Sequence, residues 1–265
     1  MSNLGRYTAI AARQSWKLAF RLTRLALIIC LAIALGFTLY AVSALPTLQP
    51  WHSERLHEEF SALLHGNLDF NGYLQQEEKL FAEMHEKIAG WDTQNEAYEF
   101  SRFNPKSPAN RLVDGAQYNR TFRLIPPKAR GHALLMHGLT DSPYSMKAMA
   151  ESLYARGMAV TVLRLPGHGT LPSMLTEMHA RDWHAAVRIA ARDIAARTPA
   201  GQPFYIGGYS TGGTLALQYT LDALEDTELR RPDRVLLVSP AIELTRIANL
   251  SRIIDFFSIV PIPVL

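Results

Sequence analysis

The residues best suited to chemistry lie around Ser210. A short apolar run at residues 204–207 leads into Gly208-Tyr209-Ser210-Thr211-Gly212, a G-x-S-x-G pattern, and a helical pattern follows at residues 214–224. In a strand, sharp turn and helix of this kind the serine hydroxyl is exposed, and glycines two residues before and after it prevent a clash. The helix directs free N–H groups to the same point. The pattern therefore predicts a nucleophile whose attack creates an oxyanion.

The elements that must position Ser210 alternate from about residue 117 onward. Short apolar strands alternating with helices are typical of a mostly parallel sheet with helices on both faces. Ligands bind such sheets at the carboxyl ends of the strands, where His137-Gly138-Leu139 and Pro166-Gly167-His168-Gly169 also fall. We expect strands at 118–125, 131–136, 158–163, 204–207 and 234–239, and helices at 145–156, 182–197 and 214–224.

Together these motifs resemble the α/β-hydrolase superfamily, most closely the branch of monoacylglycerol lipases, small carboxylesterases and serine-aminopeptidase-like hydrolases. The resemblance covers residues 118–244 and implies Ser210 as the catalytic nucleophile. It implies an oxyanion hole made by the backbone N–H groups of Leu139 and Thr211. The other motif residues that it implies are His137, Gly138, Gly208 and Gly212. The stretches that carry the resemblance are 135–140, 164–169, 182–183, 208–213 and 238–241.

Several polar residues near these motifs are interpreted as structural. We expect His137 to shape the oxyanion loop and His168 to be structural. Asp141 and Ser142 are expected to cap the helix entered at Pro143, and Asp182 is expected to be an N-cap. No metal or other cofactor is predicted, because the histidines before residue 90 lack the i, i+4 spacing of a helical metal site: His52, His57, His65 and His85.

The sequence after Ser210 contains no histidine. A serine hydroxyl needs a neighbouring base, and the resemblance implies an acid and then a histidine beyond the nucleophile. Of the acids that follow, Glu243 is the best placed, just past a strand end. The prediction is an α/β-hydrolase domain whose C-terminal part is missing, with residues 253–265 starting a cap segment. The alternative for this apolar tail is a second membrane-contacting segment.

The N-terminal part has the composition of a membrane anchor. Residues 1–24 contain five basic side chains and no acid, and the uncharged run from Leu25 to Leu45 is long enough to span a bilayer as one transmembrane helix. The positive-inside rule places residues 1–24 in the cytoplasm and the hydrolase domain outside, on the periplasmic side in a bacterium. A cleaved signal peptide is the alternative, because Val42-Ser43-Ala44 offers small residues for cleavage.

The chain is therefore divided into a basic tail (1–24), an anchor (25–45), a helical and loop linker (46–116) and a partial hydrolase domain (117–265). The linker contains a helical region at 53–88, interrupted near 67–72. No nucleic-acid partner is predicted, because the net charge of +3 comes from the tail. The predicted function is a membrane-anchored serine hydrolase that cleaves carboxylic esters of hydrophobic or lipid-like substrates. A related peptidase, thioesterase or amidase and a non-catalytic membrane protein remain alternatives.

Overall fold

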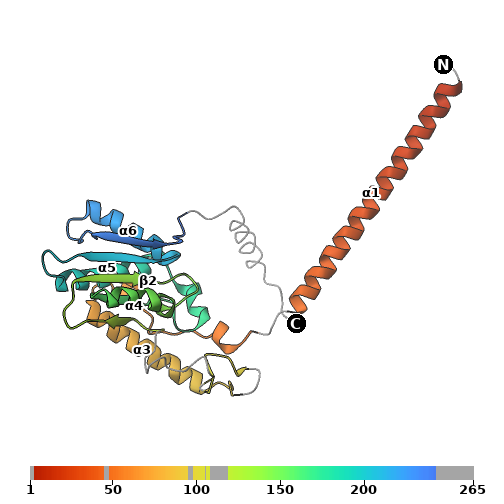
Figure 1. The fold of residues 1–265 in the computed structure, drawn as a ribbon. Coiled ribbons are helices and arrows are strands. Elements are labelled where there is room, and N and C mark those ends of the chain that lie inside the picture. Colours follow the sequence, from red (N-terminus) through yellow and green to blue (C-terminus); the bar gives the residue numbers. More distant parts are fainter. Residues whose placement is uncertain (1–2, 45–47, 95–97, 105, 108–118, 243–265) are drawn as a thin grey trace. The chain divides into compact units, whose positions relative to one another are not determined.

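The computed structural model describes residues 3–44, 48–94, 98–104, 106–107 and 119–242, and it divides into two compact units, Met1–Gln49 and Pro50–Leu265. The first unit contains one long helix, α1 (Asn3–Ser43), drawn in red and orange in Figure 1. Its segment Trp16–Ala41 has a mean hydropathy of 2.3 and is long and apolar enough to cross a membrane. The large apolar side chains from Trp16 to Tyr40 are all at least 50% exposed. This apolar segment begins earlier than Leu25, because Trp16, Leu18, Phe20 and Leu22 alternate with the last basic residues of the tail in the same helix.

The second unit is built on a sheet that, within the described residues, has five strands in the order β1-β3-β2-β4-β5. β1 runs antiparallel to β3, and the other neighbouring strands are parallel. The mostly parallel sheet expected from the alternating pattern is thus confirmed. The strands are β1 (Phe122–Leu124), β2 (Gly131–Met136), β3 (Met158–Leu163), β4 (Phe204–Tyr209) and β5 (Arg234–Val238).

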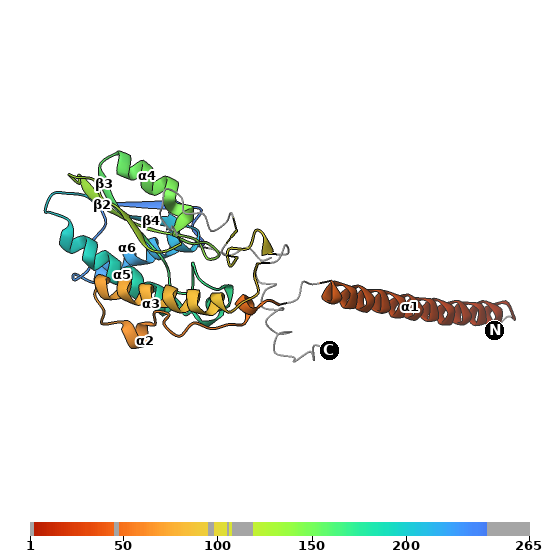
Figure 2. The ribbon, with the colours of Figure 1, turned by 90° about the horizontal axis from the view of Figure 1, so that it is seen from below.

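Helices cover both faces of this sheet (Figures 1 and 2). Side chains of successive strand residues point to opposite faces, so Ala133 and Leu135 of β2 join the core under α4, whereas Leu134 and Met136 join the core under α5 and α6. The helices are α4 (Lys147–Ala155), α5 (Ala180–Arg197) and α6 (Thr211–Glu225), with short 3₁₀ turns η4 (Pro143–Met146) and η5 (Pro172–Glu177) before α4 and α5.

The segment after residue 50 packs against the sheet unit, which corrects our expectation of a linker. It contains η1 (Pro50–His52), α2 (Ala62–His65) and α3 (Phe70–Ala89), and α3 lies along α5 (Figure 2). Phe60 and Tyr73 are buried in the core between α5 and the sheet. The apolar positions at helical spacing in α3 are therefore a core face, and this segment belongs to the same compact unit as the strands.

The helix start in this segment also differs from the expectation. Residues 53–61 are not helical, and α3 begins at Phe70, within the region where an interruption was expected. The cause is a cap: the Asp69 carboxylate accepts a hydrogen bond from Gly72 N at 2.7 Å.

Asp182 lies at the third position of α5 rather than at its N-cap, so the N-cap prediction is wrong. His179 is the N-cap, and the Asp182 carboxylate accepts its backbone N–H at 3.0 Å, as in a capping box. The other carboxylate oxygen accepts Ala62 N at 2.8 Å, so Asp182 fastens the start of α2 to the start of α5. Ser142 is the N-cap of η4 but makes no capping bond, because its hydroxyl donates to Asn119 Oδ1 at 2.7 Å.

Candidate active site

Ser210 connects β4 to α6 on a strained turn. Its backbone has φ = 51° and ψ = −116°, a conformation that side chains other than glycine rarely adopt. The turn packs directly on the end of β2. A Cβ atom on Gly212 would lie 2.3 Å from Met136 O, and one on Gly208 would lie 2.5 Å from the same oxygen. Both glycines are required because backbone, rather than a flexible side chain, occupies the space.

The backbone of Ser210 is held from the β5 side. Its N–H donates to Val238 O at 2.9 Å, and its carbonyl accepts Ala241 N at 3.3 Å. The Ser210 side chain makes no capping hydrogen bond to α6. Since α6 begins at Thr211, three residues before the expected start, the Thr211 N–H belongs to the first turn, where amides have no partner within the helix.

Leu139 and Thr211 follow neighbouring strands at the same edge of the sheet. Met136 pairs with Gly208 in the parallel register of β2 and β4, and each of the two residues lies three positions beyond that pair. Contact between the two turns is close, since a Cβ on Gly138 would lie 3.0 Å from the Tyr209 ring. Leu139 itself is 48% exposed. The loop that contains Leu139 is therefore next to the serine turn and open to solvent.

The His137 ring is buried next to this loop, and both of its nitrogens are hydrogen-bonded to backbone groups. Its Nε2 accepts Leu165 N at 3.1 Å, so the proton is on Nδ1, which donates to Gly138 O at 2.8 Å. Burial, with a smaller effect of His168, lowers the pKa of His137 to about 3, and the ring is neutral at physiological pH. The peptide is trans and planar, so the N–H of Leu139 points away from the carbonyl that His137 binds.

His168 holds the next carbonyl of the same loop. Its Nε2 lies 2.6 Å from Leu139 O and its Nδ1 lies 2.9 Å from Pro166 O, which also accepts the Trp183 indole N–H at 2.9 Å. Burial lowers the pKa of His168, so the ring carries one proton at neutral pH. We assign that proton to Nε2, because its contact with Leu139 O is the shorter of the two and Pro166 O also accepts the Trp183 indole N–H. Both rings are buried, and each of their nitrogens lies against a backbone atom, so we assign neither histidine a role in proton transfer.

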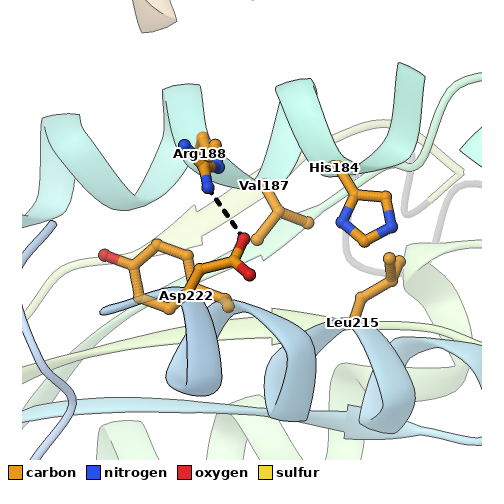
Figure 3. Close-up of a pocket in the computed structure, with 6 residues that line it drawn as sticks. His184, Val187, Arg188, Leu215 and Asp222 are labelled. Atoms are coloured by element: carbon orange, nitrogen blue, oxygen red, sulfur yellow. Dashed lines mark hydrogen bonds and ion pairs between the residues drawn. The ribbon is translucent and has the colours of Figure 1, made fainter. Parts of the chain in front are cut away.

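The last histidine of the sequence, His184, lies on a helical face rather than at the strand ends. Figure 3 shows it on α5, beside the ion pair in which Arg188 Nη2 contacts Asp222 Oδ2 of α6 at 2.8 Å. The depression between these helices is too shallow to hold a solvent molecule. We therefore assign no catalytic base within the described residues, and Glu243 lies outside them.

A cavity of about 420 Å³ opens beside the Leu139 loop. Its walls are residues of the loop that begins at Thr140, residues of the turn after β3, and Arg102. Arg102 Nη2 donates to Gly169 O at 2.6 Å and to Thr170 O at 2.8 Å. Sequence reasoning missed Arg102, because it lies in an irregular stretch with no motif. In the part of the chain that the structure describes, no cluster of three His, Cys, Asp or Glu side chains is arranged to hold a metal ion.

The mixed sheet, the helices on both faces and the strained serine between β4 and α6 define an α/β hydrolase. A family model for "Serine aminopeptidase, S33" matches residues 127–260, about half of the chain, and the chain belongs to this family.

Individual relatives match over shorter stretches. A thermostable monoacylglycerol lipase from Bacillus sp. (strain H-257) is 37% identical over 84 residues, which is 32% of this chain and 32% of that protein. A solved structure from work on LipS and LipT, two metagenome-derived lipolytic enzymes, is 28% identical, with a TM-score of 0.43 over 50% of this chain and 51% of that one. Esterase B from Lactobacillus rhamnosis is 16% identical, with a TM-score of 0.38 over 66% of this chain and 64% of that one. The chain thus aligns with about a third of the lipase and half of the first structure.

Proposed function

We propose that this protein is a serine esterase of the lipase type, with Ser210 as the nucleophile. The observation that carries the proposal is the φ of +51° at Ser210, on a turn whose two glycines fit against the end of β2. A strained backbone at a surface-accessible serine is a frequent mark of a functional site. The family match and the lipase relative support the same reaction class.

In the proposed reaction the Ser210 Oγ attacks the carbonyl carbon of an ester and forms a tetrahedral adduct. The negative charge on the former carbonyl oxygen is stabilised by the backbone N–H groups of Leu139 and Thr211. Each such donor contributes about 3–4 kcal/mol to lowering the barrier. The alcohol then leaves and water releases the acyl group from Ser210, with a histidine and an acid as the proton-transfer groups that the resemblance implies.

The surface around Ser210 favours hydrophobic substrates. Three apolar or aromatic residues lie in or next to the serine turn and the Leu139 loop. Their side chains are largely exposed: Leu139 at 48%, Tyr209 at 41% and Ile242 at 64%. Exposed apolar groups at a reactive site favour contact with an acyl chain. The substrate class that we propose is therefore a carboxylic ester with an apolar acyl group, and the monoacylglycerols named for the bacterial relative are examples.

The test is a substrate panel on the full-length protein in detergent. It compares p-nitrophenyl butyrate and octanoate and 1-oleoylglycerol with an aminoacyl p-nitroanilide and an acyl thioester. We expect kcat/KM for the octanoate ester to exceed that for the anilide by at least about 100-fold, because the apolar surface binds the acyl chain. Faster cleavage of the anilide would contradict the esterase proposal and indicate a peptidase. Faster cleavage of the thioester would indicate a thioesterase.

We also propose that α1 anchors the protein in a membrane, with residues 1–24 in the cytoplasm and the hydrolase unit outside, in the periplasm of a bacterium. The apolar segment Trp16–Ala41 and the basic residues before and within it support this orientation. The expected result is that protein from the membrane fraction has the intact mass of the uncleaved chain. A mature chain that begins after Ala44 would instead support the cleaved signal peptide.

A further inference from the structure

A buried ion cluster joins the segment after residue 50 to the sheet. Arg164, at the end of β3, is 1% exposed, and its Nη2 contacts Glu59 Oε1 at 2.9 Å while its Nε contacts Glu77 Oε2 at 3.0 Å. Tyr73 donates its hydroxyl to Arg164 O at 2.6 Å. Both glutamates lie before residue 127, where the match to the family model begins. Separating the partners of such a cluster is strongly destabilising, because it leaves a buried charge without compensation.

The same groups hold the turn that follows β3. Glu59 Oε2 accepts Gly167 N at 2.9 Å, and Arg164 Nη1 donates to His168 O at 3.0 Å. Gly167 and Gly169 have φ values of +81° and +71°, so this turn has a backbone geometry that only glycine adopts without strain. The carboxylate and the guanidinium thus fix the turn from the buried side.

The turn after β3 is hydrogen-bonded to the loop that contains Leu139. His168 donates from Nε2 to Leu139 O, and His137, which accepts Leu165 N from the turn, donates to Gly138 O. The two histidines therefore orient the peptide planes on both sides of the Leu139 Cα, and these planes determine where its N–H points. Leu139 is half exposed, so little packing would hold it otherwise.

We propose that the segment before the family region positions the oxyanion loop through a relay that runs from Glu59 to Arg164 and on to His168. This proposal rests on the proposed function, because it takes the Leu139 N–H as an oxyanion donor. Glu59, Arg164 and His168 are positioning residues: they act through Leu139, and no contact with substrate is assigned to them. A misplaced oxyanion donor lowers the rate of the chemical step more than it weakens substrate binding.

The decisive variants are His168→Gln and His168→Asn. The glutamine amide nitrogen reaches the place of Nε2 and can still donate to Leu139 O, whereas the asparagine nitrogen reaches the place of Nδ1 and cannot. In the full-length protein we expect His168→Asn to lower kcat for p-nitrophenyl butyrate about 10–100-fold with little change in KM. His168→Gln should retain kcat within about three-fold. Equal losses in both variants, with equal melting temperatures, would overturn the relay.

The role of Glu59 is tested by a double-mutant cycle. If Glu59 acts through His168, the single variant Glu59→Gln has a lower kcat than the wild type. In the His168→Asn background the same substitution lowers kcat little further. Additive effects would contradict the relay. Glu59→Asp, which keeps the charge, serves if the glutamine variant does not fold. The matched control is Glu78→Gln, at the α3 residue that follows Glu77. The Glu78 carboxylate is 71% exposed and pairs with Arg120 at the surface, so the kcat of this variant should equal that of the wild type.

Hydrogen exchange separates this inference from the proposed function. If the wild-type protein shows no turnover, the proposed function fails, and the amides of residues 138–142 still report the loop. We expect these amides to exchange faster in His168→Asn than in His168→Gln. Identical exchange in both variants would refute the positioning of the loop by His168, whatever the activity.

Discussion

Ser210→Ala is expected to lower kcat for ester substrates by about 10⁴-fold or more, or about 5 kcal/mol of barrier. Alanine removes the Oγ that forms the acyl-enzyme bond but keeps the turn, whose geometry depends on Gly208 and Gly212. Hydrolysis of p-nitrophenyl butyrate and labelling by a fluorophosphonate probe measure the loss. Ser152→Ala, at an exposed position of α4 on the opposite face of the sheet, is the control that should keep full activity.

The strain at Ser210 gives this prediction a second readout. A backbone at φ = 51° costs about 1–3 kcal/mol for a residue with a Cβ, and glycine avoids most of that cost. Ser210→Gly should therefore be inactive yet more stable to denaturant than Ser210→Ala. Labelling that persists in both variants would assign the nucleophile elsewhere. Wild-type protein without labelling or turnover would favour the non-catalytic membrane protein.

Arg164→Met is expected to destabilise the hydrolase unit by about 3–5 kcal/mol, the largest effect on stability that we predict. The substitution leaves Glu59 and Glu77 buried without a cation, and it also removes the donor to His168 O. Burial already raises the pKa of Glu77, against the opposing effect of Arg164. Without Arg164, at least one of the two carboxyl groups must take up a proton or reach solvent.

The measurement is urea unfolding of the full-length protein followed by tryptophan fluorescence. Arg188→Met is the matched control, because Arg188 also pairs with two acids, Asp222 at 2.8 Å and Asp226 at 3.5 Å, but is 36% exposed. An exposed pair contributes about 0–1 kcal/mol. A loss for Arg164→Met no greater than for Arg188→Met would mean that the buried cluster is not a stabilising element.

The sheet and the serine turn could be read from the sequence because their signals are local. β2 and β3 have the bounds expected from their apolar runs, since strands buried on both faces are mainly apolar; His132 in β2 and Thr161 in β3 do not interrupt the pattern. A sharp turn at Ser210 was expected from the glycines two residues before and after it, and the serine has a positive φ. Helix starts were less accurate: α6 begins at Thr211 because the turn itself enters the helix, a geometric detail that hydrophobic spacing does not encode.

The buried polar residues could not be predicted, because their partners are far away in sequence. Glu59 and Glu77 look like solvated charges on a linker, and only Arg164 makes their burial tolerable. The same holds for Asp182, whose capping role is local but whose bond to Ala62 N is not. The oxyanion-hole roles of Leu139 and Thr211 remain predictions, as do the limits of the basic tail and the anchor.

The distance in sequence between these partners also determines when the unit can fold. Glu59 and Arg164 are 105 residues apart, and Ala62 and Asp182 are 120 apart. At a synthesis rate of about 5–20 residues per second, Glu59 waits roughly 5–20 s for Arg164 to be made. Contacts of high sequence separation form late, because closing the chain costs entropy before any bond is gained. The complete unit therefore cannot form during that interval, and its early segment has to wait for residues that are made more than 100 positions later.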